Sequence, residues 1–237
     1  MKVLLTGAAG HIGRCLGPAF GNRYELRTLD RQPNPADPGQ LVADLTDADA
    51  LRNACAGIEV IVHLAASSSD KSPFVAEIVP NNIVGLYHLL EAARQQSVRR
   101  VVFASTAQAT SRYPADRTVT TLDPVRPEGP YGATKVFGEA LGRMYHEAHG
   151  LEFIAIRIGA FQAYDTKWPP AWLRRLWLSP RDCVELFRCA VERPGVGYAI
   201  VYGTSALPVE YLSRREAREI LGYEPRDRWE EYFGGQR

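Results

Sequence analysis

Two residues of this chain are suited to proton transfer, and they stand four positions apart: Tyr131 and Lys135. Residues i and i+4 of a helix lie on one face, so the phenol and the ammonium can point into one pocket. A tyrosine with its ordinary pKa of about 10 is a poor base at neutral pH, and a nearby positive charge lowers that pKa. The spacing therefore indicates a phenol activated by an amine, although an accidental pair on an exposed helix would have the same spacing.

A glycine-rich segment near the start of the chain has the spacing of a phosphate-binding turn. An apolar run at 3–5 leads into Gly7, Gly10 and Gly13, and a helical pattern follows at once. Gly7 allows a tight turn, Gly10 lets the backbone approach a pyrophosphate, and Gly13 lets the helix pack against the strand. The start of the helix presents free N–H groups to the phosphates. A strand, a turn and a helix in this order predict a dinucleotide site.

An acidic residue, Asp30, stands at the end of a second predicted strand, 24–29. A carboxylate about twenty residues after such a glycine turn binds ribose hydroxyls and repels a 2′-phosphate, so it favours NAD over NADP. Arg31 and Arg14 leave NADP open, because a guanidinium near the ribose can accommodate the phosphate. A second interpretation of Asp30 is that it caps the backbone of a loop.

The remaining strands and helices must place these residues at one edge of a sheet. Buried strands are predicted at 41–43, 58–64, 101–104 and 153–158, and they alternate with helices at 81–96 and 131–149. This alternation predicts an α/β fold, a doubly wound parallel sheet of the Rossmann type with right-handed crossovers. We expect residues 1–158 to form an NAD-binding domain and residues 159–237 a small substrate region packed on it as one structural unit.

The composition is that of an ordinary soluble globular protein. The chain has 237 residues, 46% hydrophobic and 23% charged, with a formal net charge of +1, so nothing suggests a nucleic acid or a membrane as partner. No apolar run approaches the ~20 residues that span a bilayer, and we expect a cytoplasmic protein. Cys15, Cys55, Cys183 and Cys189 lack metal-ligand spacing, so reduced buried thiols and no metal site are expected.

At this point the chain resembles a known family, the extended short-chain dehydrogenase/reductases, also called the NAD-dependent epimerase/dehydratase family. The similarity spans nearly the whole sequence. Within the family, the stretches 82–87, 102–105, 137–139 and 143–145 are most similar to bacterial uronate dehydrogenases, which oxidise the anomeric hydroxyl of a uronate with NAD. The residues that carry the family resemblance are Gly7, Gly10, Gly13, Asp30, Asp44, Leu45, His63, Leu64, Ala65, Ala66, Asn82, Thr106, Tyr131, Lys135, Arg157, Ile158, Gly159 and the segment 221–225.

The resemblance implies a role for each matching position. Tyr131 would take the hydroxyl proton, Lys135 would lower the pKa of Tyr131 and hold the nicotinamide ribose, and Thr106 would hydrogen-bond the reacting oxygen. The implied cofactor contacts are Gly7, Gly10, His11, Ile12, Gly13, Asp30, Arg31, Asp44, Leu45, Leu64, Ala65, Ala66, Asn82, Tyr131, Lys135 and Ile158. The implied substrate contacts are Ser68, Thr106, Gln108, Tyr131 and Arg174.

The chain departs from the uronate pattern in the substrate positions. Ala107-Gln108 replaces the Asn-His pair that binds the sugar, Ala160 replaces a serine, and Trp172 falls where the carboxylate-binding arginine is expected. Arg174 could serve after a shift of register, or it could lie on a solvated helix face. The segment 167–172 is aromatic and rich in proline, and could stack on a sugar or merely cover the sheet.

Three functions remain open from the sequence. The first is an NAD-dependent dehydrogenase of a sugar or sugar acid, the second an epimerase or dehydratase of a sugar or nucleotide sugar, and the third a sensor that binds NAD without turnover. Family dimers pair two helices, here 81–96 and 131–149, so a homodimer is expected. Gly138, Ala140 and Gly142 would permit close helix approach.

Overall fold

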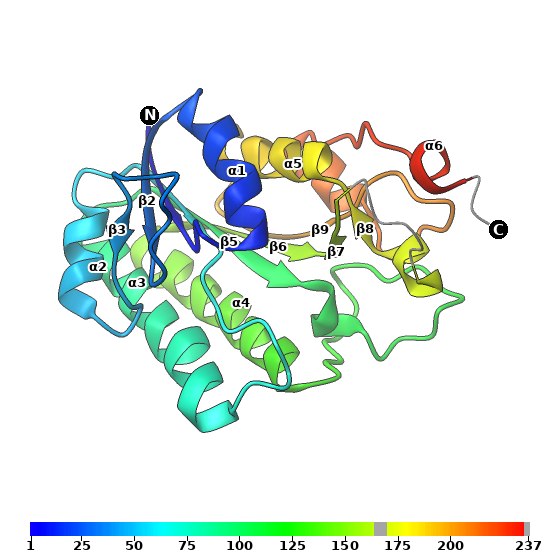
Figure 1. Ribbon diagram of the computed structural model, residues 1–237. Helices are drawn as coiled ribbons and strands as arrows, with labels where there is room; N and C mark the ends of the chain where they lie inside the picture. Colours follow the sequence, from blue (N-terminus) through cyan, green and yellow to red (C-terminus); the bar gives the residue numbers. More distant parts are fainter. Residues whose placement is uncertain (164–169, 235–237) are drawn as a thin grey trace.

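A computed structural model describes residues 1–163 and 170–234. Its centre is a parallel sheet of seven strands in the order β3-β2-β1-β4-β5-β6-β9 (Figure 1). The predicted doubly wound Rossmann fold is confirmed, because the strand order reverses at β1 and helices cover both faces. The strands are β1 (Lys2–Thr6), β2 (Glu25–Asp30), β3 (Leu41–Val42), β4 (Val60–His63), β5 (Arg100–Thr106), β6 (Glu152–Ile158) and β9 (Tyr198–Gly203).

The central strands are apolar because both of their faces are covered. All residues of β4 and β5 are buried, as is expected of parallel strands between two layers of helices. Figure 1 shows α1 and α5 on one face of the sheet and α2, α3 and α4 on the other. The helices are α1 (His11–Gly21), α2 (Ala48–Cys55), α3 (Gly85–Gln95), α4 (Pro130–His149), α5 (Pro180–Glu192) and α6 (Trp229–Phe233).

Local signals set several helix ends. Pro130 and Pro180 occupy the first position of α4 and α5, where a missing N–H has no consequence. The hydroxyl of Ser179 accepts from the N–H of Asp182 at the start of α5, and Gly150 ends α4 in a left-handed conformation with φ 71°. The helix predicted at 131–149 therefore agrees with α4 to within one residue at its start and ends at the same residue.

The predicted helix at 81–96 has a different form. A π-helical segment, η1 (Phe74–Val84), comes first and continues directly into α3. Pro80 lies inside it and has no N–H to donate, so one regular helical hydrogen bond is missing there. A second π-helical segment, η4 (Ala217–Leu221), lies near the C-terminal end of the described chain and ends at Gly222, which has φ 71°.

The C-terminal part completes the sheet and adds short elements above its edge. Strand β9 pairs with β6, while β7 (Ala160–Phe161) pairs with β8 (Trp177–Leu178) in a separate two-stranded sheet. Short 3₁₀ helices, η2 (Ala107–Thr110) and η3 (Ala171–Arg175), follow β5 and precede β8. Within the described ranges no helix is long and apolar enough to cross a bilayer. The predicted contacts of Lys167, Trp168 and Pro169 lie outside the described residues.

Gly138 and Gly142 let α4 lie close to the elements that it packs on. A Cβ on Gly138 would lie 2.5 Å from the ring of Phe103 and 2.9 Å from the side chain of Leu86, and a Cβ on Gly142 would meet the ring of Phe153. Gly138 therefore permits close approach of α4 both to β5 and, within the same chain, to α3.

Candidate active site at the carboxyl edge of the sheet

A cavity of about 820 Å³ lies at the carboxyl ends of β1, β4, β5 and β6. In an open α/β sheet this edge, where the strand order reverses, is where ligands bind. Among the residues predicted from the sequence, the wall includes Gly7, Gly10, His11, Ile12, Gly13, Asp30, Arg31, Asp44, Leu45, Leu64, Ala65, Ala66, Ser68, Thr106, Gln108, Tyr131, Lys135 and Ile158. The fold therefore gathers nearly all of them around one cavity.

The glycine segment has the shape that a pyrophosphate requires. Gly7 has φ +74°, and a Cβ there would lie 2.6 Å from the amide nitrogen of Ala65. A Cβ on Gly13 would lie 2.6 Å from the carbonyl oxygen of Ala8. Gly10 is the N-cap of α1 and provides no side-chain cap, so the first N–H groups of the helix remain available beside the cavity.

Asp30 is held rigidly at the end of β2. Its Oδ2 accepts from the N–H of Ala9 at 2.9 Å, and its Oδ1 accepts from the N–H of Gln32 at 2.9 Å. The interpretation of Asp30 as a backbone cap is confirmed, and the same carboxylate lies on the cavity wall. Arg14 and Arg31 lie on the same wall, so two positive charges stand near the carboxylate.

Tyr131 and Lys135 both lie on the wall of this cavity, as their spacing on α4 predicted. The ammonium of Lys135 stands 4.7 Å from the ring centre of Phe103 and 5.7 Å from that of Tyr131. Lys135 is 2% exposed, and burial lowers its pKa to about 7. At neutral pH this amine is therefore poised between its charged and neutral forms.

The phenol of Tyr131 is not activated by the protein alone. Burial is the largest effect and, with the charge of Asp70, raises the pKa of Tyr131 to about 12, while hydrogen bonding with Thr106 lowers it. The sequence predicts that the charge of Lys135 lowers this pKa. In the structure desolvation of the phenolate raises it instead, and burial also lowers the pKa of Lys135 and so disfavours the charge of that amine.

A second cavity, of about 430 Å³, adjoins the first. The two share Thr106, Gln108 and Gly159, so a molecule in the second cavity reaches the catalytic edge of the first. Its wall carries aromatic side chains, Tyr113, Trp172 and Tyr211, together with one arginine, Arg175, and one carboxylate, Glu128.

The arginine on this wall is Arg175 and not Arg174. Side chains three residues apart on a 3₁₀ helix lie one above the other, so Trp172 and Arg175 share the face of η3 that lines the cavity. Arg174 is exposed and is absent from both walls. The prediction of Arg174 as a substrate contact was wrong by one residue, and the i+3 spacing from Trp172 would have identified its neighbour.

Asn82 supports the site from behind instead of lining it. Its side chain accepts from the N–H of Ser67 at 2.8 Å, and donates to the carbonyl of Ser67 and to the hydroxyl of Thr134, each at 3.0 Å. Asn82 is buried, and the preceding residue, Asn81, lies on the cavity wall in its place. The predicted cofactor contact is thereby corrected to a structural link between a loop and α4.

Comparisons with known proteins agree with this geometry. A model of the NAD dependent epimerase/dehydratase family matches residues 3–200. The NAD-dependent glucose-6-phosphate dehydrogenase of Haloferax volcanii is 36% identical, over 99% of this chain and 97% of its own. The L-arabinose 1-dehydrogenase (NAD(P)(+)) of the same organism is 35% identical, over 95% of this chain and 96% of its own. The crystal structure of uronate dehydrogenase from Agrobacterium tumefaciens superposes with a TM-score of 0.89 at 34% identity, covering 100% of this chain and 89% of that one.

Proposed function

The chain belongs to the NAD dependent epimerase/dehydratase family and is an NAD-dependent dehydrogenase of the extended short-chain type, and we propose that it oxidises a hydroxyl of a small sugar or sugar acid. The observation that carries the proposal is the position of Thr106, which stands on the walls of both cavities, with Tyr131 and Lys135 beside it on the larger one. A substrate in the smaller cavity thus meets the proton acceptor at the edge of the cofactor cavity.

The residues of the larger cavity fit a dinucleotide. We assign the free N–H groups at the start of α1 to the pyrophosphate, and Asp30 to the ribose of the adenosine half. Lys135 has room for a hydroxyl partner, because its ammonium contacts only the faces of aromatic rings in the described structure. NAD, when bound, supplies the hydride acceptor.

The chain's own residues handle the proton. The phenolate oxygen of Tyr131 accepts the proton of the substrate hydroxyl, and Thr106 donates a hydrogen bond to the same substrate oxygen. Since the pKa of Tyr131 is about 12 without ligands, the charged form of Lys135 is needed to stabilise the phenolate. Each unit by which the pKa of Tyr131 falls corresponds to about 1.4 kcal/mol.

The second cavity favours a sugar with an anionic group. Arg175 brings a guanidinium to the wall, 5.5 Å from the ring centre of Tyr211, and such a group pairs well with a carboxylate or a phosphate. We assign residues 1–158 chiefly to cofactor binding. Residues 159–237 contribute the outer wall through Ala160, Trp172, Arg175 and Tyr211.

The test is the production of NADH, followed at 340 nm, with glucose 6-phosphate, glucuronate, galacturonate and L-arabinose. Turnover of a free sugar supports the proposal, whereas interconversion of a nucleotide sugar without net NADH would select an epimerase. Arg175→Ala should raise KM for an anionic sugar about tenfold or more, since a charge-assisted hydrogen bond contributes about 1.5–3 kcal/mol. Arg174→Ala is the matched control and should change KM less than twofold. Equal KM values for Arg175→Ala and the wild type would refute the anion assignment.

We further propose that the enzyme is a cytoplasmic homodimer. Phe137, Ala140 and Met144 form an exposed stripe on α4, and Val84 and Tyr87 are exposed on the neighbouring η1 and α3. A second copy of the chain would cover these side chains. All four cysteines are free, which suits a reducing compartment. Light scattering of the wild type and of Tyr87→Arg tests the dimer, and cell fractionation tests the compartment.

A further inference from the structure

A loop far from α4 in sequence caps the start of that helix. Asp70 belongs to the loop 67–72, which follows β4, and its Oδ1 accepts from the backbone N–H of Tyr131 at 2.8 Å. The N-cap of α4 is Gly129, which has no side chain to provide this acceptor. A carboxylate satisfies an N–H that the helix leaves unpaired and is favoured by the helix dipole.

Gly129 leaves room for this contact because it has no side chain. A Cβ added to Gly129 would lie 2.6 Å from the carboxyl carbon of Asp70, so the carboxyl group occupies the space that a side chain would need. The backbone of Gly129 has φ −141° and ψ 176°, an extended conformation that any residue adopts. Alanine at this position would therefore displace the carboxyl group of Asp70 without straining the backbone.

A second link ties the same loop to the same turn of α4. The amide of Asn82 bonds both backbone groups of Ser67 and reaches the hydroxyl of Thr134. Thr134 in turn donates to the carbonyl of Tyr131 at 2.8 Å. Ser68, between the two links, lies on the wall of the cofactor cavity. The loop 67–72 is thus fastened to the turn of Tyr131 through Asn82 at one end and through Asp70 toward the other.

The charged groups that face the phenol of Tyr131 are few in the described structure. Asp70 approaches from the loop and Lys135 from α4, while Thr106 of β5 presents a neutral hydroxyl. His63, at the end of β4, is neutral because burial lowers its pKa to about 3. The negative charge of Asp70 acts against ionisation of the phenol.

We propose that Asp70 is a positioning residue of this dehydrogenase, which pins the loop 67–72 to the first turn of α4 and thereby fixes where the phenol of Tyr131 stands in the cavity. The inference rests on the proposed function, since Tyr131 is taken as the proton acceptor. Asp70 holds the phenol in place through its hydrogen bond and raises the pH at which the phenol ionises through its charge.

The two effects are separated by three variants. Asp70→Asn keeps an oxygen that accepts the N–H of Tyr131 but removes the charge. Asp70→Ala removes both, and Gly129→Ala displaces the carboxyl group while leaving its charge on the chain. Asp49→Asn, on the exposed surface of α2, is the matched control for loss of a surface carboxylate. Thermal unfolding of each variant confirms that it is folded.

We expect Asp70→Ala and Gly129→Ala each to lower kcat about tenfold at the pH optimum, and the double variant to be no worse than either. Effects that multiply in the double variant would show that the residues act independently, and would refute the link. Asp70→Asn should keep kcat within about twofold. The acidic limb of its pH profile, where protonation of the phenol of Tyr131 removes activity, should move about half a unit lower. A profile that coincides with those of the wild type and Asp49→Asn would refute the proposed effect of the charge of Asp70 on the phenol of Tyr131.

A measurement without substrate separates this inference from the proposed function. The ionisation of Tyr131 is followed by NMR of ¹³Cζ-labelled tyrosine, with Tyr131→Phe used to assign its resonance. The midpoint should be lower in Asp70→Asn than in the wild type even if every candidate sugar fails to react. Hydrogen exchange in residues 67–72 should increase in Asp70→Ala and Gly129→Ala. Unchanged exchange in both variants would refute the proposal that Asp70 holds this loop against the first turn of α4.

Discussion

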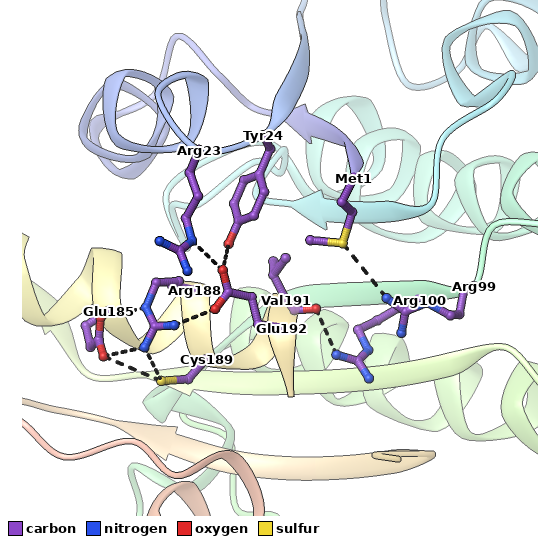
Figure 2. A network of polar contacts seen from close by, with 10 residues as sticks. All are labelled: Met1, Arg23, Tyr24, Arg99, Arg100, Glu185, Arg188, Cys189, Val191 and Glu192. Atoms are coloured by element: carbon purple, nitrogen blue, oxygen red, sulfur yellow. Dashed lines mark hydrogen bonds and ion pairs between the residues drawn. The ribbon is translucent and has the colours of Figure 1, made fainter. Parts of the chain in front are cut away.

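A buried arginine at the amino edge of the central sheet and a buried lysine at its carboxyl edge differ in whether the chain pairs their charge. At the amino edge, Glu192 near the end of α5 accepts from Arg23, Tyr24 and Arg188 (Figure 2). Arg100, at the start of β5, is fully buried, yet it donates to the carbonyls of Ala190 and Val191 and pairs with Glu152. Charges at this edge are neutralised within the chain, as a purely structural region requires.

At the carboxyl edge the chain leaves the charge of Lys135 unpaired. Lys135 is nearly as deeply buried as Arg100, but no carboxylate among residues 1–163 and 170–234 pairs with it. Its pKa falls to about 7, while the pKa of Tyr131 rises to about 12. Burial disfavours the charge of both cations, and Glu152 offsets part of this effect at Arg100. No carboxylate of the described residues does so at Lys135, so burial of this amine works against stability.

The largest expected effect is on the rate of the reaction at the carboxyl edge. Tyr131→Phe removes only the phenolic oxygen, so we expect kcat to fall roughly 10³-fold while the affinity for NAD stays within a few-fold. Initial rates at 340 nm and fluorescence titration of NADH measure the two quantities. Turnover at the level of the wild type would remove Tyr131 from the reaction.

The next largest effect is on the free energy of unfolding, and it arises at the amino edge. Arg100→Met leaves the buried carbonyls of Ala190 and Val191 without their donor and removes one of the two arginines that pair with Glu152. We expect the free energy of unfolding to fall by about 3 kcal/mol, because buried acceptors lose their hydrogen bonds. Because the site lies at the other edge, kcat should stay within twofold. Urea unfolding gives the first value and the NADH assay the second. A loss of activity in a variant that is still folded would contradict this separation of the edges.

The smallest expected change in stability has the opposite sign. Lys135→Met should abolish turnover but raise the free energy of unfolding by about 1–2 kcal/mol at pH 7, since it removes a cation that burial disfavours. The pKa of Lys135 is near 10.5 in the unfolded chain and about 7 when folded, so the unfolded chain binds more protons between these values. The stability of the wild type should therefore rise with pH across that window, and the advantage of the variant should vanish near pH 10.5. Parallel stability curves for the two proteins would contradict the unpaired cation.

Residues that act through short spacings were predicted well from the sequence. The glycine turn, Asp30 and the pair of Tyr131 and Lys135 each follow from local geometry: a tight turn, the end of a strand and one helical turn. The alternation of strands and helices predicted the parallel sheet. Parallel order then brings the carboxyl ends of the strands to one edge, where these residues lie.

The sequence predictions failed where tertiary packing determines which of two adjacent residues faces the cavity. Arg174 and Arg175 are equivalent in composition, and only the register of η3 decides which of them lines the cavity. Asn81 and Asn82 are divided in the same way by the π-helical turn of η1. Gly138 has no side chain and could face a helix or a sheet, and in the structure it lies against both Phe103 of β5 and Leu86 of α3.

The sequence by itself determined the fold class, the position of the dinucleotide edge and the placement of Tyr131 and Lys135 on one face of a helix, because each depends on residues close together in the chain. Only the tertiary structure decided which cations are paired, which arginine enters the substrate cavity, and that Asp70 meets Tyr131 across 61 positions. The physical reason is that burial and charge pairing depend on neighbours in space. Spacing along the chain identifies those neighbours only within one element of secondary structure.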